Sequence, residues 1–228
     1  MSFFDPTSAV SAKDFVYAKL KNQILNLELP PGTALSEKES ASAFNVSRTP
    51  VRESFLRLAQ EGLVQVLPQR GTFVSLIDPN QVEEARFMRE QLEKAVIRLA
   101  CDEFPAESLE ALRSNLRKQL EGMERQDDMA LFELDEAFHR TLFEGCGKLN
   151  TWIAIQQINA HLNRARLLRL VSAHQWSHVY EQHERMVRAI EAGDADAAAG
   201  TMQEHLLLSV KDQAALMEQF PHYFKQGG

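Results

Sequence analysis

The hydrophobic and polar positions at the start of the chain predict two short helices with a sharp break between them. Apolar residues recur at helical spacing over residues 14–27, and the Pro-Pro-Gly sequence at 30–32 ends that helix. The next helix is expected to begin at Ser36 and to run to Ala43, because Ser36 and Glu39 have the spacing of a capping box.

A third helix should follow directly. Asn45 can adopt a left-handed turn conformation, Ser47 can cap the new helix, and Pro50 falls in its first turn, where a missing N–H is tolerated. Arg48 and Arg52 are four residues apart, so they share one face at the N-terminal end of this helix. The apolar positions on its inward face are Val51, Phe55 and Leu58.

A hairpin follows the third helix, which ends at Gly62. Residues 63–67 and 72–76 are expected to be strands, and the Pro-Gln-Arg-Gly sequence at 68–71 is their turn. Helix, turn, helix and hairpin in this order are typical of a winged helix-turn-helix, which reads double-stranded DNA. An arginine at the start of the third helix can hold O6 and N7 of a guanine together, and Arg70 at the hairpin tip can reach a phosphate or a minor groove.

The rest of the chain has helical periodicity and few strand signals. The predicted fold class is therefore mainly α: an N-terminal winged helix-turn-helix followed by a C-terminal all-α antiparallel helical bundle. The expected helices of the bundle lie near residues 79–103, 106–125, 128–145, 149–170, 175–192 and 194–217. The expected domain bounds are 1–12 for a flexible N-terminus, 13–77 for the DNA-binding domain, 78–218 for the helical domain and 219–228 for a C-terminal tail.

Composition and charge narrow the class of protein. The chain has 228 residues, of which 44% are apolar, and contains no run near the roughly 18 uncharged apolar residues that a membrane span requires. Cys101 and Cys146 are too few for a disulfide framework, so we expect reduced thiols and a cytoplasmic protein with no membrane partner. The net charge is −7, but residues 1–77 carry 8 Lys+Arg against 7 Asp+Glu, whereas residues 78–228 carry 17 against 25. Clustered arginines can therefore still steer DNA binding, with a strong salt dependence.

The segment LSEKESASAFNVSRTPVRESFLRLAQEGLV, followed by PQRGTFV, resembles the GntR family of bacterial transcription regulators over residues 13–77. A regulator of this kind is expected to bind an inverted-repeat operator as a homodimer, because two matched recognition helices gain affinity and register. Many members carry arginine where this chain has Lys38, and a lysine keeps a phosphate contact but lacks the planar fork. The resemblance implies DNA contacts at Lys38, Arg48, Thr49, Arg52, Arg70 and Gly71.

Acidic and imidazole side chains in the helical half have the pattern of a metal site. Asp135 and His139 are four residues apart among apolar neighbours, so both should face inward from one helix. A buried acid needs a partner, and a metal ion supplies one. His183 and His205 also lie among apolar positions, and three imidazoles with one carboxylate suit Zn²⁺, Ni²⁺ or Mn²⁺. The alternative is that these histidines only line a core pocket. The histidines expected to be structural or exposed are His161, His174 and His178.

The motifs D-x-x-x-H, H-E-x-M-V-x-A-I and M-x-x-H-L resemble the FadR-type ligand domain, FCD, over about residues 80–217. Metal-binding members use an Asp and three His at these positions, which correspond to Asp135, His139, His183 and His205 here. The resemblance further implies that a small organic acid, a carboxylate metabolite, binds at the open positions of the metal with the help of arginines. Of the candidates Arg86, Arg89, Arg164, Arg166 and Arg169, we favour Arg89 and Arg164 as effector-binding residues.

The leading hypothesis is a transcription regulator, not an enzyme, whose operator affinity is controlled by a small organic acid at the metal site. A metal-dependent hydrolase is one alternative, because an Asp and three His with open positions can activate water. Glu136 and Glu184 adjoin the ligands but are turned about 100° away from them, so neither is an obvious general base. The other alternative is a metal sensor, in which the ion itself is the signal.

Overall fold

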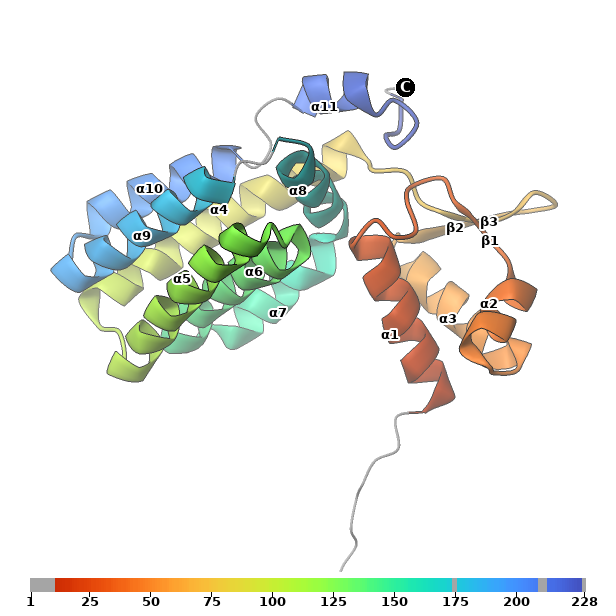
Figure 1. Ribbon diagram of the computed structural model, residues 1–228, viewed down its shortest axis with the longest axis horizontal. Coiled ribbons are helices and arrows are strands. Elements are labelled where there is room, and N and C mark those ends of the chain that lie inside the picture. Colours follow the sequence, from red (N-terminus) through yellow and green to blue (C-terminus); the bar gives the residue numbers. More distant parts are fainter. Residues whose placement is uncertain (1–10, 174–175, 209–212, 227–228) are drawn as a thin grey trace, which may run out of the picture. The chain divides into compact units, whose positions relative to one another are not determined.

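The computed structural model describes residues 11–173, 176–208 and 213–226, and the chain divides into two compact units, Met1–Leu76 and Ile77–Gly228. Most of the predicted flexible N-terminus, residues 1–10, lies outside the described residues. The fold is mainly α, with a small sheet in the first unit, which confirms the predicted fold class (Figure 1). No helix in the described part of the chain combines the length and the apolar character needed to cross a membrane.

The first unit is a winged helix-turn-helix. Its sheet has the order β1-β3-β2, and both pairs of neighbouring strands are antiparallel. The elements of this unit are α1 (Ala12–Leu25), β1 (Ala34–Leu35), α2 (Glu37–Phe44), α3 (Arg48–Gln60), β2 (Val64–Leu67) and β3 (Gly71–Val74). The strand β1 was not predicted, because two residues are too short for a period-2 pattern.

Local sequence signals set the turn between α2 and α3. The Ser36 hydroxyl accepts the Glu39 backbone N–H at 3.3 Å, which confirms that Ser36 caps α2. Asn45 takes the predicted left-handed conformation, with φ of +53°. Ser47 occupies the N-cap position of α3, but its side chain makes no capping hydrogen bond, so that part of the prediction is wrong.

The first helix differs from its prediction in its bounds. It begins at Ala12, where the Ser11 hydroxyl accepts the Asp14 backbone N–H at 3.1 Å, and ends before Leu27. Phe15 is 41% exposed. The buried side chains are Val16, Leu20 and Ile24, and α1 packs against α3, whose buried apolar side chains are Val51, Phe55 and Leu58. On both helices the buried apolar side chains therefore recur at helical spacing.

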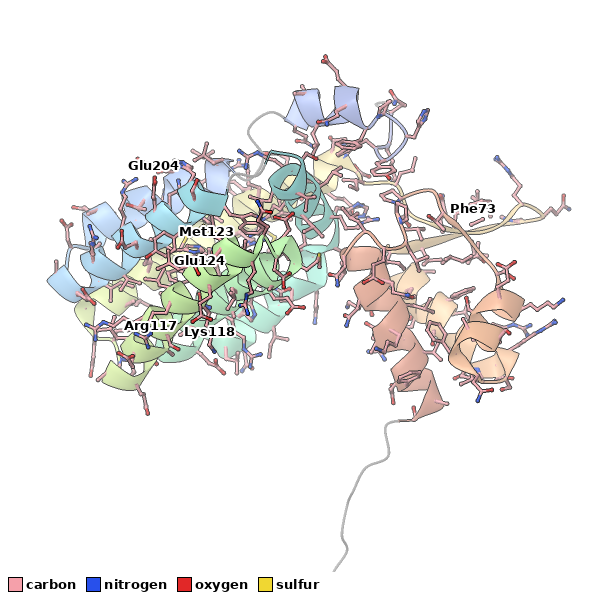
Figure 2. All side chains as sticks on the ribbon, viewed as in Figure 1. Phe73, Arg117, Lys118, Met123, Glu124 and Glu204 are labelled. Carbon is pink, nitrogen blue, oxygen red and sulfur yellow. The ribbon has the colours of Figure 1, made fainter. Side chains whose placement is uncertain are left out.

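The second unit is an antiparallel helical bundle. Its helices are α4 (Pro79–Asp102), α5 (Ala106–Arg125), α6 (Asp128–Gly145), α7 (Leu149–Ile158), α8 (Ala160–Ala173), α9 (Trp176–Ala192), α10 (Ala195–Leu208) and α11 (Gln213–Gln219). The amphipathic pattern is clear on α5, where Arg117 and Lys118 project outward (Figure 2) while Leu112 and Leu116 are buried. α10 packs along α4 and α9, and α5 packs against α6 and α9.

The expected single helix over residues 149–170 is two helices, α7 and α8, with a turn at Asn159. Asparagine is a weak helix former because its side chain competes for backbone hydrogen bonds. Apolar periodicity continues across this position, which is why the sequence pattern did not show the break. The expected helix over residues 194–217 corresponds to α10 and α11, and residues 209–212 between them lie outside the described residues.

The described part of the predicted C-terminal tail packs against the first residues of the second unit. Ile77 and Phe224 form a parallel bridge, in which the Ile77 N–H donates to the Tyr223 carbonyl and the Lys225 N–H donates to the Ile77 carbonyl, each at 2.8 Å. Both Ile77 and Phe224 are buried. The bundle therefore includes one short extended contact that was not predicted.

Candidate functional site

The residues predicted to contact DNA lie on exposed parts of the first unit. Lys38 is exposed on α2, and Arg48, Thr49 and Arg52 are exposed in the first two turns of α3. The capping bond at Ser36 and the turn at Asn45 position these two helices, so the basic side chains follow from local sequence signals.

The side chain of Arg52 is held in place before any DNA is bound. Its Nε and Nη2 donate to the two carboxylate oxygens of Glu37 at 2.9 and 3.0 Å. Hydrogen bonding from Arg52 keeps the pKa of Glu37 below its usual value, and the nearby charge of Arg48 adds to this effect. Within the described part of the chain, no ion pair involves Arg48, so its guanidinium is available to an anionic partner.

The wing residue Arg70 lies in the turn between β2 and β3, Gly71 is the first residue of β3, and both are exposed. The Arg70 N–H donates to the Leu67 carbonyl at 3.1 Å, which closes the turn. Gly71 has φ of +113°, a conformation that side-chain-bearing residues rarely adopt, so glycine is needed there. The arginine is thereby presented at the tip of the hairpin.

In the second unit, three helices bring together the four residues predicted as metal ligands. Asp135 and His139 come from α6, His183 from α9 and His205 from α10, and all four are buried. Each offers one ligand atom, and these atoms lie within 4.8 Å of one another. The Asp135 Oδ1 atom is 3.9, 3.6 and 3.7 Å from the Nε2 atoms of His139, His183 and His205, respectively. We call this group the Asp-His cluster.

Each imidazole of the Asp-His cluster has a side-chain oxygen near its Nδ1 atom, and the Nε2 atoms of His139 and His205 lie 3.1 Å apart. His139 Nδ1 lies 2.5 Å from Glu93 Oε2. The Nδ1 atoms of His183 and His205 lie 3.1 Å from Gln119 Oε1 and 3.0 Å from Gln182 Oε1, respectively. When the Gln119 or Gln182 oxygen accepts a hydrogen bond from Nδ1–H, a lone pair is left on Nε2 of His183 or His205, as in metal-binding histidines. Sequence reasoning missed these three partners, which are Glu93, Gln119 and Gln182.

Two polar atoms at the centre of the Asp-His cluster have no hydrogen bond in the described structure: Asp135 Oδ1 and His183 Nε2. Leaving such buried atoms without a partner is costly. Burial lowers the pKa of His183 to about 3 and that of His205 well below its usual value. Burial would raise the pKa of Asp135, but the positive charge of Arg166 holds it well below its usual range. The cluster therefore combines an ionised Asp135 carboxylate with neutral imidazoles at His183 and His205, which is the state in which these groups bind a cation.

Among the candidate arginines, Arg166 contacts the Asp-His cluster directly. Its Nη2 donates to Asp135 Oδ2, and its Nη1 donates to Glu136 Oε1 at 2.6 Å. Arg89, favoured from the sequence, is buried and pairs with Glu93 at 2.5 Å. Arg164, also favoured, is buried and points its Nη2 toward His161 Nδ1 at 3.2 Å. Neither Arg89 nor Arg164 lines the cavity described next.

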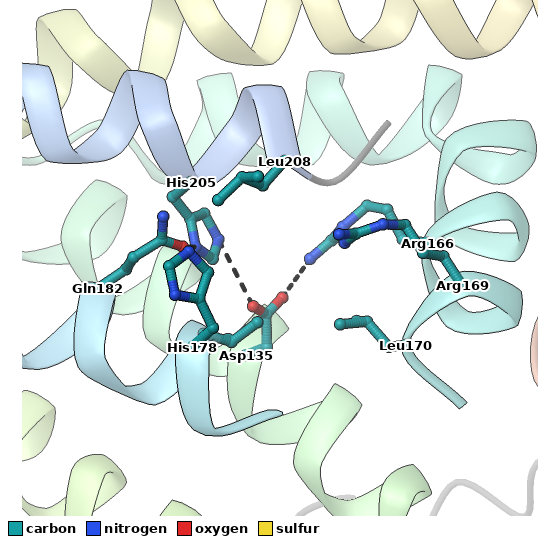
Figure 3. A pocket seen from close by; sticks show the side chains of 9 residues that line it. Asp135, Arg166, Arg169, Leu170, His178, Gln182, His205 and Leu208 are labelled. Atoms are coloured by element: carbon teal, nitrogen blue, oxygen red, sulfur yellow. Dashed lines mark hydrogen bonds and ion pairs between the residues drawn. The ribbon is translucent and has the colours of Figure 1, made fainter. Parts of the chain in front are cut away.

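A small cavity of about 20 Å³ adjoins the Asp-His cluster. Figure 3 shows Asp135 between His205 on one side and Arg166 on the other. This volume has room for about one water molecule. The cavity is lined by Asp135, Arg166, Arg169, Leu170, His178, Val179, Gln182, His205 and Leu208. A larger, open hollow of about 640 Å³ shares His178, Gln182 and Leu208 with it.

The remaining candidates have other environments. Glu136, considered as a general base, accepts hydrogen bonds from Arg166 and Gln156. His161 is buried and accepts the Asp78 backbone N–H at 3.0 Å, whereas His178 is exposed at the cavity edge, and His174 lies outside the described residues. Cys101 and Cys146 are free thiols, and burial raises the pKa of both.

Comparison with known proteins shows similarity in both units. Residues 12–74 match the family of bacterial regulatory proteins named gntR, and residues 84–208 match the FCD domain. An HTH-type transcriptional regulator in an unstable DNA locus of Streptomyces ambofaciens is 41% identical over 211 residues, which are 92% of this chain and 88% of that protein. The HTH-type transcriptional repressor RspR of Escherichia coli K12 is 35% identical over 202 residues, 89% of this chain and 88% of the repressor. The fold resembles that of E. coli McbR/YncC, with a TM-score of 0.76 at 24% identity over 92% of this chain and 99% of that chain.

Proposed function

The chain belongs to the GntR family of bacterial regulatory proteins and carries an FCD domain, so it is a DNA-binding transcription regulator and not an enzyme; we propose that a small carboxylate at a metal ion in the Asp-His cluster controls its affinity for operator DNA. Because such a regulator acts where the chromosome lies, we place it in the cytoplasm. The hydrolase alternative is set aside, since the family and its relatives are regulators.

One observation carries the proposal of a metal site: Asp135 Oδ1 and His183 Nε2 are buried at the centre of the cluster and have no hydrogen-bond partner in the described structure. A divalent cation would satisfy both atoms at once. Asp135, His139, His183 and His205 would hold it, and their nitrogen and oxygen donors suit Zn²⁺, Ni²⁺ or Mn²⁺. When bound, the ion supplies positive charge that attracts a carboxylate.

The carboxylate would lie on the cavity side of the cluster. Arg166 and Arg169 line this cavity, so we assign them in place of Arg89 and Arg164 as the arginines nearest the acid. A cavity of about 20 Å³ cannot hold an organic acid without rearrangement. We propose that the acid enters from the open hollow of about 640 Å³ that shares Leu208 with this cavity and displaces lining side chains such as Leu208, which would give it different affinities for two arrangements of the domain.

We further propose that the protein binds an inverted-repeat operator as a homodimer. The exposed basic residues of α2, α3 and the wing supply one half-site contact surface per protomer. Arg48 and Arg52 would read base edges, and Arg70 would contact the backbone or a minor groove. Lys38, Thr49 and Gly71 complete this surface.

The test begins with metal content. The protein is stripped with chelator, reloaded with Zn²⁺, Ni²⁺ or Mn²⁺ in turn and analysed for bound metal, with Asp135→Asn and His178→Asn compared. We expect one ion per chain in the protein and in His178→Asn, and a large loss in Asp135→Asn. Absence of stoichiometric metal from the reloaded protein would refute the metal site.

Operator binding then separates the acid from the ion as the signal. An operator is first selected from random-sequence DNA, and affinity is measured with metal alone, with a panel of short mono- and dicarboxylates alone, and with both. We expect the affinity to change only when metal and acid are both present. The cavity has room for little more than one water molecule beside the cluster, which favours the metal sensor as the second candidate. A full response to metal alone would establish that second candidate.

A further inference from the structure

The junction that follows the DNA-binding unit is held by side chains and backbone from distant parts of the second unit. Ile77 is the first residue of that unit, and Tyr223 and Lys225 bond its N–H and carbonyl groups. The Lys225 ammonium group also lies 2.9 Å from the Asp78 carboxylate. Asp78 in turn caps α4, since its side chain accepts the Asn80 N–H at 3.0 Å.

A buried imidazole on α8 holds the same junction. His161 Nδ1 accepts the backbone N–H of Asp78 at 3.0 Å, and the side chain is 3% exposed. Burial, followed by the charge of Arg164, lowers the pKa of His161 to about 4. The ring is therefore neutral near pH 7, and its Nδ1 lone pair serves as a hydrogen-bond acceptor.

The helix that carries His161 also carries the arginine of the Asp-His cluster. Arg166 follows five residues later, about 7.5 Å along the helix axis, and bonds Asp135 and Glu136. The turn at Asn159 separates α8 from α7. The Asn159 side-chain amide is buried and makes no hydrogen bond in the described structure, while the Asn159 carbonyl accepts the Asn163 N–H at 2.8 Å. α8 is thus one short helix that contacts the Asp-His cluster through Arg166 and the junction through His161.

We propose that α8 transmits the state of the Asp-His cluster to the junction, with His161 as the positioning residue that couples Arg166 to the backbone of Asp78. This inference rests on the proposed function for the nature of the signal. Asp135 faces Arg166 through Oδ2 and the three imidazoles through Oδ1. A ligand that draws Asp135 toward the imidazoles would weaken the bond between Asp135 and Arg166, and a new anion beside Arg166 would compete with that bond. Either change would alter how α8 is held. A shift of about 0.6 Å suffices to break a 3.0 Å hydrogen bond, since such bonds are lost near 3.6 Å.

The coupling can be tested first without any ligand. Amide exchange at Asp78 is measured by NMR on the full-length, metal-free protein and on Arg166→Met. Arg140→Met is the control, because Arg140 is on α6, exposed, and pairs only with Glu144 in the described structure. We expect exchange at Asp78 to rise about two- to tenfold in Arg166→Met, as for the loss of one hydrogen bond, and to stay unchanged in the control. Unchanged exchange in Arg166→Met would overturn the coupling whatever the cluster binds.

The second test uses Zn²⁺ as the probe and varies His161. His161→Leu removes the acceptor, whereas His161→Asn keeps an acceptor atom bonded to Cγ. We expect both variants to bind Zn²⁺ as the unmodified protein does, but only His161→Asn to show the Zn²⁺-dependent change in Asp78 exchange. A purely structural role of His161 would not produce this rescue.

Failure of the inference and failure of the proposed function give different results. If Zn²⁺ binds and His161→Leu keeps the full change in Asp78 exchange, α8 does not transmit the signal while the metal site stands. If no Zn²⁺ binds, the proposed metal site fails, and the comparison of Arg166→Met with Arg140→Met still decides whether α8 couples the cluster to the junction.

Discussion

Replacing His183 by leucine separates a metal ligand from a histidine that only fills the core. The His183 ring is fully buried and stacks on Phe138, with centroids 4.1 Å apart and planes at 15°. Its Nδ1 bonds Gln119, and its Nε2 has no hydrogen-bond partner in the described structure. The substitution His183→Leu removes all three features at nearly constant volume.

The expected cost without metal is small because its contributions oppose one another. Loss of the ring contact costs about 0.5–1.5 kcal/mol. The Gln119 oxygen left without a donor costs about 1–3 kcal/mol, and removal of the unsatisfied Nε2 returns a similar amount. In chelator, the free energy of unfolding of His183→Leu should therefore lie within about 2 kcal/mol of that of the unmodified protein.

Metal should increase the difference in free energy of unfolding between the unmodified protein and His183→Leu. A ligand at 100 times its dissociation constant stabilises a folded protein by about 2.7 kcal/mol, and a variant that no longer binds it gains nothing. The packing contributions are the same in both conditions, so they cancel in the comparison of the two free-energy differences. The increase in this free-energy difference on adding metal thus measures how much His183 contributes as a metal ligand.

The assay is urea unfolding at one protein concentration, with chelator and with excess Zn²⁺. His178→Leu is the matched control, because His178 lines the same cavity but is exposed and not part of the Asp-His cluster. We expect Zn²⁺ to stabilise the unmodified protein and the control, but not His183→Leu. Equal stabilisation of all three proteins, or a loss of 4 kcal/mol or more in chelator (about the cost of deleting a large core side chain), would refute the reasoning.

Three further predictions concern other parts of the chain. Arg52→Ala should keep its fold and weaken binding to a selected operator by about ten- to hundredfold in a mobility-shift assay, whereas retained sequence-specific affinity would contradict the assigned recognition face. Glu37→Gln should tighten DNA binding and steepen its salt dependence, because it removes the carboxylate that competes with phosphate for Arg52; weaker binding would instead mean that Glu37 orients the guanidinium. Gly145→Ala should lower the free energy of unfolding by about 1–3 kcal/mol, because the added Cβ would lie 2.3 Å from Cε2 of Phe104, and an added Phe104→Leu should restore part of the loss in urea unfolding.

Much of the first unit could be predicted because its signals are local. A capping serine, a left-handed Asn45 and a Gly-containing hairpin turn act within a few residues, and each specifies backbone geometry directly. The inward stripe of α3 follows from its spacing in the same way. The sequence did not show which of Phe15 and Val16 is buried on α1, since both are apolar and only the packing of the helix decides.

In the bundle, local patterns showed which side chains face inward but not which ones meet. Asp135 and His139 share one helix face by spacing, and motif resemblance added His183 and His205. The choice of Arg166 over Arg89 and Arg164 depends on how α8 is placed against α6, and that placement follows a break at Asn159 that has no periodic signature.

The sequence by itself thus determined the two-part, mainly helical fold, the outward basic residues of α2 and α3 and the inward faces of the bundle helices. Only the tertiary structure decided the partners: Glu93, Gln119 and Gln182 behind the imidazoles, Arg166 on Asp135, and the return of Phe224 to Ile77. The physical reason is the distance along the chain over which each kind of interaction acts. Backbone hydrogen bonding and amphipathic spacing act over a few residues, whereas these contacts join groups 23 to 147 positions apart and exist only once the helices pack.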